Sequence, residues 1–91
     1  MATYKAVLMH GERGGEGRYS FEAEDGVLER STHATMTAFM QHLQGKLEPA
    51  HMDWRLDGVL RNDDLGVITA AGTLIFDAGD RQPFVCMINE A

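Results

Sequence analysis

The stretch "STHATMTAFMQHLQGKLEP" (residues 31–49) decides the fold, because within it the apolar residues stop alternating and recur at every third or fourth position. At that spacing they form one stripe along an α-helix, the pattern of a helix packed on a core. The stripe consists of Met36, Phe39, Met40, Leu43 and Leu47. Ser31 or Thr32 can cap the first turn with its hydroxyl, and Pro49 disfavours helical geometry in the residue before it. We therefore predict one helix over about residues 32–47.

Short segments that read as β-strands lie on both sides of this helix. Residues 18–24 and 52–61 alternate apolar and polar residues, which is typical of strands with one dry and one wet face, and residues 3–10 are rich in strand-forming residues. Two such segments precede the helix and three follow it; they are residues 3–10, 18–24, 52–61, 67–76 and 83–88. The short connections between the last three strands favour antiparallel neighbours. The sequence thus predicts an α+β fold of order ββαβββ, in which a single helix packs on a mainly antiparallel five-strand sheet.

The first strand after the helix carries the only tryptophan of the chain. Its alternation predicts a dry row of Met52, Trp54, Leu56 and Leu60 and a wet row of Asp53, Arg55, Asp57 and Arg61. On the dry row, Trp54 is expected to pack in the core. The alternative is that its ring stacks on a flavin or another planar ligand.

The size and composition of the chain indicate one globular domain, residues 1–91, with 44% hydrophobic residues. No apolar run approaches the roughly 18 residues that a membrane-spanning helix needs, and the first residues do not resemble a signal peptide. The single cysteine, Cys86, has no partner for an internal disulfide and lies in an apolar run, so a buried position is expected. A cytoplasmic location is the expectation that follows.

The charges argue against two classes of partner. The chain has a net charge of −6, and its eight basic residues are scattered without a run. Nucleic acids and anionic membranes are bound by concentrated positive charge, so neither is an expected partner.

The glycine-rich stretch "HGERGGEGR" (residues 10–18) is predicted to be a turn between two strands. A loop that cradles a phosphate leads from a strand into a helix, whereas this one leads into a strand. Glu12 and Glu16 would also repel a phosphate. A loop over residues 11–17 could still close over a ligand as a lid, so that alternative stays open.

We expect no metal, no cofactor and no catalytic centre from the residues that usually form them. The histidines are His10, His33, His42 and His51, and none of their spacings matches a metal-binding motif. His42 is expected on the polar side of the helix, and His33 at its first turn. Asp63 and Asp64 lie in a turn, where solvated carboxylates contribute little to catalysis.

One helix, about 10 Å across, covers only two or three strands of such a sheet. The face turned away from the helix nevertheless carries apolar residues on its first, fourth and fifth strands. The expected interface residues are Val7, Met9, Thr73, Ile75, Val85 and Met87. Because an exposed apolar patch usually marks an interaction surface, the sequence predicts a non-enzymatic binding or accessory protein that forms a homodimer through this face or a strand edge.

A second hypothesis is a small-ligand-binding protein or minor enzyme. Its pocket would lie between sheet and helix or at a dimer seam, with residues 11–17 as the lid. His10, Arg18 and Trp54 would line the site, and a small molecule or another protein would be the partner.

Overall fold

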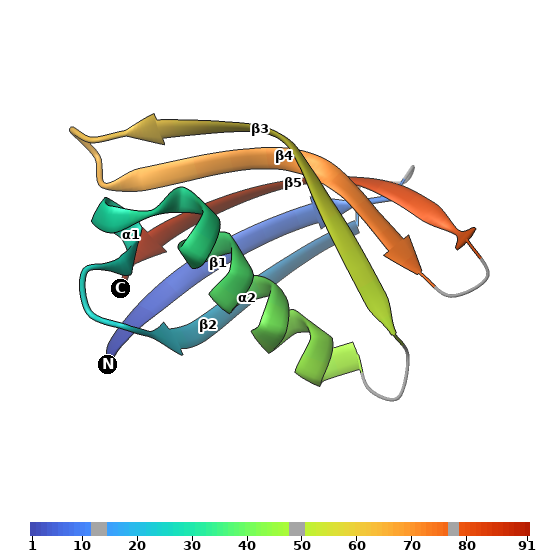
Figure 1. Cartoon of the computed structure of the whole chain (residues 1–91), viewed down its shortest axis with the longest axis horizontal. Coiled ribbons are helices and arrows are strands. Elements are labelled where there is room, and N and C mark those ends of the chain that lie inside the picture. Colours follow the sequence, from blue (N-terminus) through green and yellow to red (C-terminus); the bar gives the residue numbers. More distant parts are fainter. Residues whose placement is uncertain (12–14, 48–50, 77–78) are drawn as a thin grey trace.

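The computed structural model describes residues 1–11, 15–47, 51–76 and 79–91. They form one five-stranded sheet, a long helix and a short helix (Figure 1). The strands are β1 (Ala2–His10), β2 (Gly15–Ala23), β3 (Met52–Asn62), β4 (Val67–Phe76) and β5 (Arg81–Glu90), and the helices are α1 (Val27–Arg30) and α2 (Thr32–Leu47). The predicted α+β fold and the order ββαβββ are confirmed.

The strand order is β2-β1-β5-β4-β3, and every neighbouring pair is antiparallel. The two ends of the chain therefore meet in the middle of the sheet, where Val7 of β1 lies opposite Met87 of β5. The consecutive strands β3, β4 and β5 are sequential neighbours, as their short connections predict.

Helix α2 has the predicted bounds, and Ser31 caps its start. The Ser31 Oγ accepts a hydrogen bond from the Ala34 N–H at 3.1 Å, and the Ser31 carbonyl accepts one from the Thr35 hydroxyl at 2.9 Å. Because a first-turn N–H has no partner within its own helix, this cap fixes the residue at which α2 begins.

The short helix α1 is absent from the sequence prediction of a single helix. It starts after Gly26, whose φ of 74° is the left-handed conformation that glycine adopts without strain. It ends at Ser31, which is extended and separates it from α2. Four residues are too few to show a helical period, although Val27 and Leu28 are both buried.

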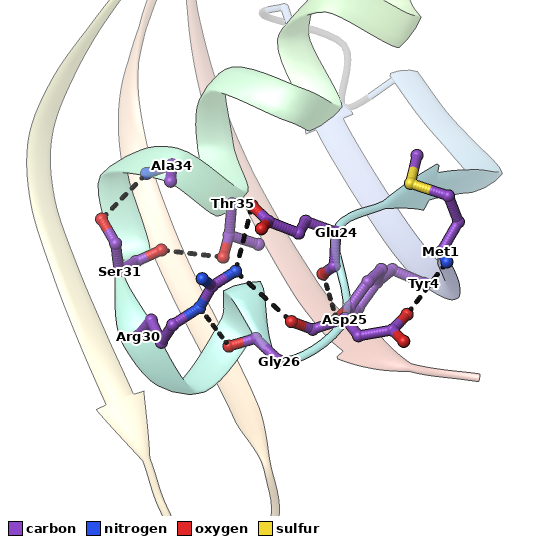
Figure 2. A network of polar contacts seen from close by, with 9 residues as sticks. All are labelled: Met1, Tyr4, Glu24, Asp25, Gly26, Arg30, Ser31, Ala34 and Thr35. Atoms are coloured by element: carbon purple, nitrogen blue, oxygen red, sulfur yellow. Dashed lines mark hydrogen bonds and ion pairs between the residues drawn. The ribbon is translucent and has the colours of Figure 1, made fainter.

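A set of polar contacts ties α1 to the start of the chain (Figure 2). The Arg30 guanidinium donates to the carbonyls of Asp25 and Gly26 and pairs with Glu24 at 3.2 Å. The Tyr4 hydroxyl donates to the Glu24 carbonyl at 3.2 Å, and the N-terminal ammonium pairs with Asp25. These contacts hold the connection between β2 and α1 against the beginning of β1.

Helix α2 covers one face of the sheet (Figure 1), and the buried core residues lie between the two. Along each strand, buried residues that face the helix alternate with more exposed residues that face away from it. The buried strand residues on the helix side include Tyr4, Ala6, Leu8, Phe21, Ile68, Leu74, Phe84, Cys86 and Ile88. The α2 stripe supplies Met36, Phe39, Met40 and Leu43. The predicted stripe is thus confirmed for these four residues, while the side chain of Leu47 lies outside the described structure.

A β-bulge in β3 overturns part of the predicted alternation. Leu56 lies opposite Gly72, but the next pairing is Gly58 with Ala71, so the strand gains one residue there. The prediction that Leu60 is on the dry row is therefore wrong, because its side chain is 75% exposed. Arg61, predicted on the wet row, instead reaches the helix side and donates to the Glu29 carbonyl of α1 at 2.9 Å.

Candidate functional site

The face of the sheet opposite α2, here the outer face, carries exposed apolar side chains on its central strands. In one row across the sheet, Val7 lies opposite Met87, Met87 opposite Thr69, and Thr69 opposite Leu60. In the next row, Met9 lies opposite Val85, and Val85 opposite Ala71. Met9 is 49% exposed, Val85 44% and Met87 49%. None of the described helices covers this face.

We call the apolar members of these two rows the outer patch. They are Val7, Met9, Leu60, Ala71, Val85 and Met87. Cross-strand partners have Cβ atoms about 5 Å apart, so these side chains form a contiguous surface. Four of the six predicted interface residues are therefore brought together in the patch.

The other two predicted interface residues lie on the outer face but beyond the patch. Thr73 lies opposite Arg55 and Pro83, and Ile75 lies opposite Arg81 and Asp53. Both are half-buried, and their neighbours are largely charged. They stand at the border of the apolar surface, where charged strand residues begin.

Leu60 and Ala71 belong to the outer patch but are missing from the sequence prediction. Leu60 reaches this face because the bulge reverses the alternation after Leu56. Gly58 is the sequence feature that could have predicted this bulge, because a glycine inside a strand often marks one.

Next to the patch, an exposed polar cluster joins β3 and β4. The Arg55 Nε donates to Asp57 Oδ1 at 3.0 Å, and another guanidinium nitrogen donates to the Thr73 hydroxyl at 3.2 Å. The Thr73 hydroxyl in turn donates to the second Asp57 oxygen at 3.4 Å. Because the cluster pairs its charges internally, it resembles the polar rim that surrounds an apolar interface.

The three residues of the ligand-binding hypothesis do not converge on one site. Arg18 lies opposite Val7 and so belongs to the outer face. Trp54 is half-buried on the helix side, packs against the core, and has the His33 ring 5.9 Å away. His10 ends β1, with its Nδ1 3.1 Å from the side-chain oxygen of Gln82. Residues 12–14 of the predicted lid lie outside the described structure.

A small hollow of about 160 Å³ adjoins His10, at the end of β1 and β5. Its lining residues are Met9, His10, Gly11, Pro83, Phe84 and Val85. Arg18 and Trp54 are not among them. Of the three residues, His10 is the one that lines this hollow, whose other lining residues are mostly apolar. Arg18 lines a different hollow, of about 350 Å³, formed by residues of β1 and β2.

The prediction that His42 lies on the polar side of α2 is wrong. Its half-buried ring packs against the rings of Tyr19 and Phe21, with centroid separations of 6.4 and 6.2 Å. Within residues 1–11, 15–47, 51–76 and 79–91, no three His, Cys, Asp or Glu side chains cluster as metal ligands would. His51 instead pairs with Asp53 at 3.4 Å.

Cys86 occupies the buried position that the sequence predicts. Its Sγ lies 3.7 Å from the sulfur of Met36, and burial raises the pKa of the thiol to about 11. The thiol is therefore protonated at neutral pH, a state in which cysteine is a poor nucleophile.

Comparisons with protein-family models, with curated proteins and with solved structures find no match to this chain. In the part of the chain that the structure describes, no helix is long and apolar enough to span a membrane. The function is therefore argued from the chain's own residues, above all from the outer patch.

Proposed function

We propose that this protein acts in the cytoplasm by binding rather than by catalysis, and that two copies associate through their outer patches. The single observation that carries the proposal is the adjacency of Met9, Val85 and Met87, which are each 44–49% exposed on neighbouring strands. Exposed apolar residues scattered singly need no explanation, whereas a contiguous patch on the middle of a sheet is typical of an interaction surface.

A second copy is a suitable occupant of this surface for two physical reasons. Two sheets pack face to face when the apolar rows of both inner faces interdigitate at a spacing of about 10 Å. The flexible side chains of Met9 and Met87 can fill an irregular gap between two identical faces. The polar cluster of Arg55, Asp57 and Thr73 would then lie at the border of the interface, where water keeps contact with it.

The test is the mass of the protein in solution, measured by size-exclusion chromatography with light scattering over the micromolar range. We expect Val85→Asp and Met87→Asp each to halve the mass of the wild-type assembly, because each buries a charge in the apolar contact. Leu65→Asp is the matched control, since Leu65 is 72% exposed in the connection between β3 and β4 and lies outside the patch.

Two results would contradict the proposal. One is a wild-type mass that corresponds to a monomer at every micromolar concentration. The other is an assembly whose mass is the same in wild type, Val85→Asp and Met87→Asp. Circular dichroism of each variant separates loss of association from loss of folding.

The second candidate function is the binding of a small ligand at His10, and the adjoining hollow favours it. Its volume of about 160 Å³ suits only a small group or the end of a larger ligand. A thermal-shift screen against metabolites, flavins and nucleotides tests this candidate. Stabilisation that His10→Ala abolishes supports it, and no stabilisation by any class contradicts it.

A further inference from the structure

We infer that the free edge of β2 is a second interface, at which β2 pairs antiparallel with β2 of another copy of this chain. β2 is the terminal strand of the sheet, and over its nine residues it pairs with β1 without a register shift. No strand of the described residues pairs with its other side. A regular edge of this kind presents a row of backbone N–H and C=O groups to an incoming strand.

The two edges of the sheet differ in this respect. At the opposite edge, β3 carries the bulge between Leu56 and Gly58, which interrupts its regular backbone. Bulges and prolines are devices by which proteins prevent pairing at an edge. β2 has neither along Gly15–Ala23, so of the two edges it is the one suited to pairing.

The charges of β2 complement those of a second β2 in one register. If the two-fold axis passes through Ser20, then Arg18 of each copy lies opposite Glu22 of the other. A centre at Arg18 or at Glu22 would instead place two identical charges opposite each other on the axis itself, which is destabilising. In the Ser20 register the like-charge pair, Glu16 with Glu24, falls at the ends of the paired segment. Arg18 and Glu22 are both exposed on the outer face, where such cross-strand pairs form.

The helix side of β2 is complementary in the same register. It places Tyr19 of each copy opposite Phe21 of the other, and aromatic cross-strand pairs are favourable. In the single chain both rings rest on Phe39 of α2, at centroid separations of 5.7 and 5.5 Å. Pairing would thus extend the aromatic layer of one copy into that of the next.

The space beside this edge is open. A hollow of about 690 Å³ adjoins the middle of β2. It is lined by Ser20, Phe21 and Glu22 of β2, by Ala38, Gln41 and His42 of α2, and by Met1 and Thr3. A strand added here would continue the sheet, with five strands from each copy, and would leave both outer patches on the outer side. Use of both interfaces would give a tetramer where the two two-fold axes intersect.

The experiment is a charge swap in the Val85→Asp/Met87→Asp background, which removes association through the outer patch. In this background we expect a dimer that is held by the β2 edges. Arg18→Glu or Glu22→Arg should raise the dissociation constant of this dimer about tenfold or more, because each substitution places two pairs of like charges opposite each other across the interface. The double variant Arg18→Glu/Glu22→Arg restores the opposite charges and with them the dimer.

A mixture provides the sharpest form of the test. Equimolar Arg18→Glu and Glu22→Arg chains, each weak alone, are expected to form heterodimers, which native mass spectrometry resolves because the two chains differ in mass. Glu29→Arg in α1 is the control for a charge reversal outside both interfaces.

Each remaining outcome overturns one specific claim. The β2 interface is overturned if the background protein is a monomer, if its dimer does not respond to Arg18→Glu or Glu22→Arg, or if the mixture fails to form heterodimers. The proposed function fails separately, when Val85→Asp and Met87→Asp leave the wild-type mass unchanged.

Discussion

The two faces of the sheet carry similar apolar residues, which are buried on the helix side and exposed on the outer side. Along β5, Cys86 and Ile88 are 1% and 0% exposed on the helix side, while Val85 and Met87 are 44% and 49% exposed on the outer side. A buried side chain of this size contributes about 1.5–3 kcal/mol to folding. The residues of the outer patch contribute fully only when another surface covers them. Apolar character by itself therefore does not distinguish a core residue from an exposed one.

The largest difference is expected between Ile88→Ala and Met87→Ala, which truncate adjacent residues on opposite faces. Ile88→Ala should lower the free energy of unfolding by about 2–5 kcal/mol, because it leaves a cavity in the core. Met87→Ala should change it by no more than about 0.5 kcal/mol in the monomer. Urea unfolding followed by Trp54 fluorescence, at protein concentrations too low for association, measures both. Equal losses would remove the distinction between the two faces.

Gly72→Ala tests whether the close approach of β3 to β4 requires a glycine on the helix side of the sheet. A Cβ at this position would collide with the Arg55 carbonyl of β3 and lie 2.9 Å from the Phe84 ring. We expect a loss of about 1–3 kcal/mol in the free energy of unfolding, because the backbone of β3 must move. Gly45→Ala is the control, since nothing lies within 4 Å of its added carbon. It should raise the stability by about 0.5 kcal/mol through helix propensity. A neutral Gly72→Ala would show that the bulge adapts.

Ser31→Ala tests how firmly the helix is held over its face of the sheet. Loss of the hydroxyl leaves the Ala34 N–H without its cap, and we expect a cost of about 1 kcal/mol. Thermal and urea unfolding measure it. At protein concentrations too low for association, Ser20→Ala, at an exposed serine of β2, should change the stability by less than about 0.5 kcal/mol. If the two substitutions cost the same, the cap does not stabilise α2.

The smallest expected effect is the contribution of the Cys86 thiol to the pH dependence of the free energy of unfolding, which is absent at neutral pH. Burial raises its pKa to about 11, so the unfolded chain loses this proton at lower pH than the folded one. The unfolded state therefore binds fewer protons between about pH 9 and 11, and the stability must fall as the pH rises through that range. The difference in stability between wild type and Cys86→Ala should shrink over these pH values and stay constant below them. A constant difference at all pH values would contradict the burial effect.

The sequence predicts the elements whose pattern is long and regular. Helix α2 follows from the apolar stripe of Met36, Phe39, Met40 and Leu43, and the strands follow from their alternation. Helix α1 is missed because four residues hold barely one turn, and Leu60 is misplaced because a single extra residue in β3 reverses every later side chain. His42 is misplaced because the neighbours that bury it, Tyr19 and Phe21, come from a distant strand.

The sequence by itself determined which residues are apolar, where the period changes, and hence the fold class, because these are local properties that neighbouring side chains impose on the backbone. Only the tertiary structure decided that β1 and β5 meet, which joins Met9 to Val85 and Val7 to Met87 in one surface. Strand order depends on contacts between residues far apart in the chain, and no local pattern encodes them. The same reason applies to the edge of β2: among the described strands none pairs with it, because the chain continues through α2 to β3 at the opposite edge of the sheet.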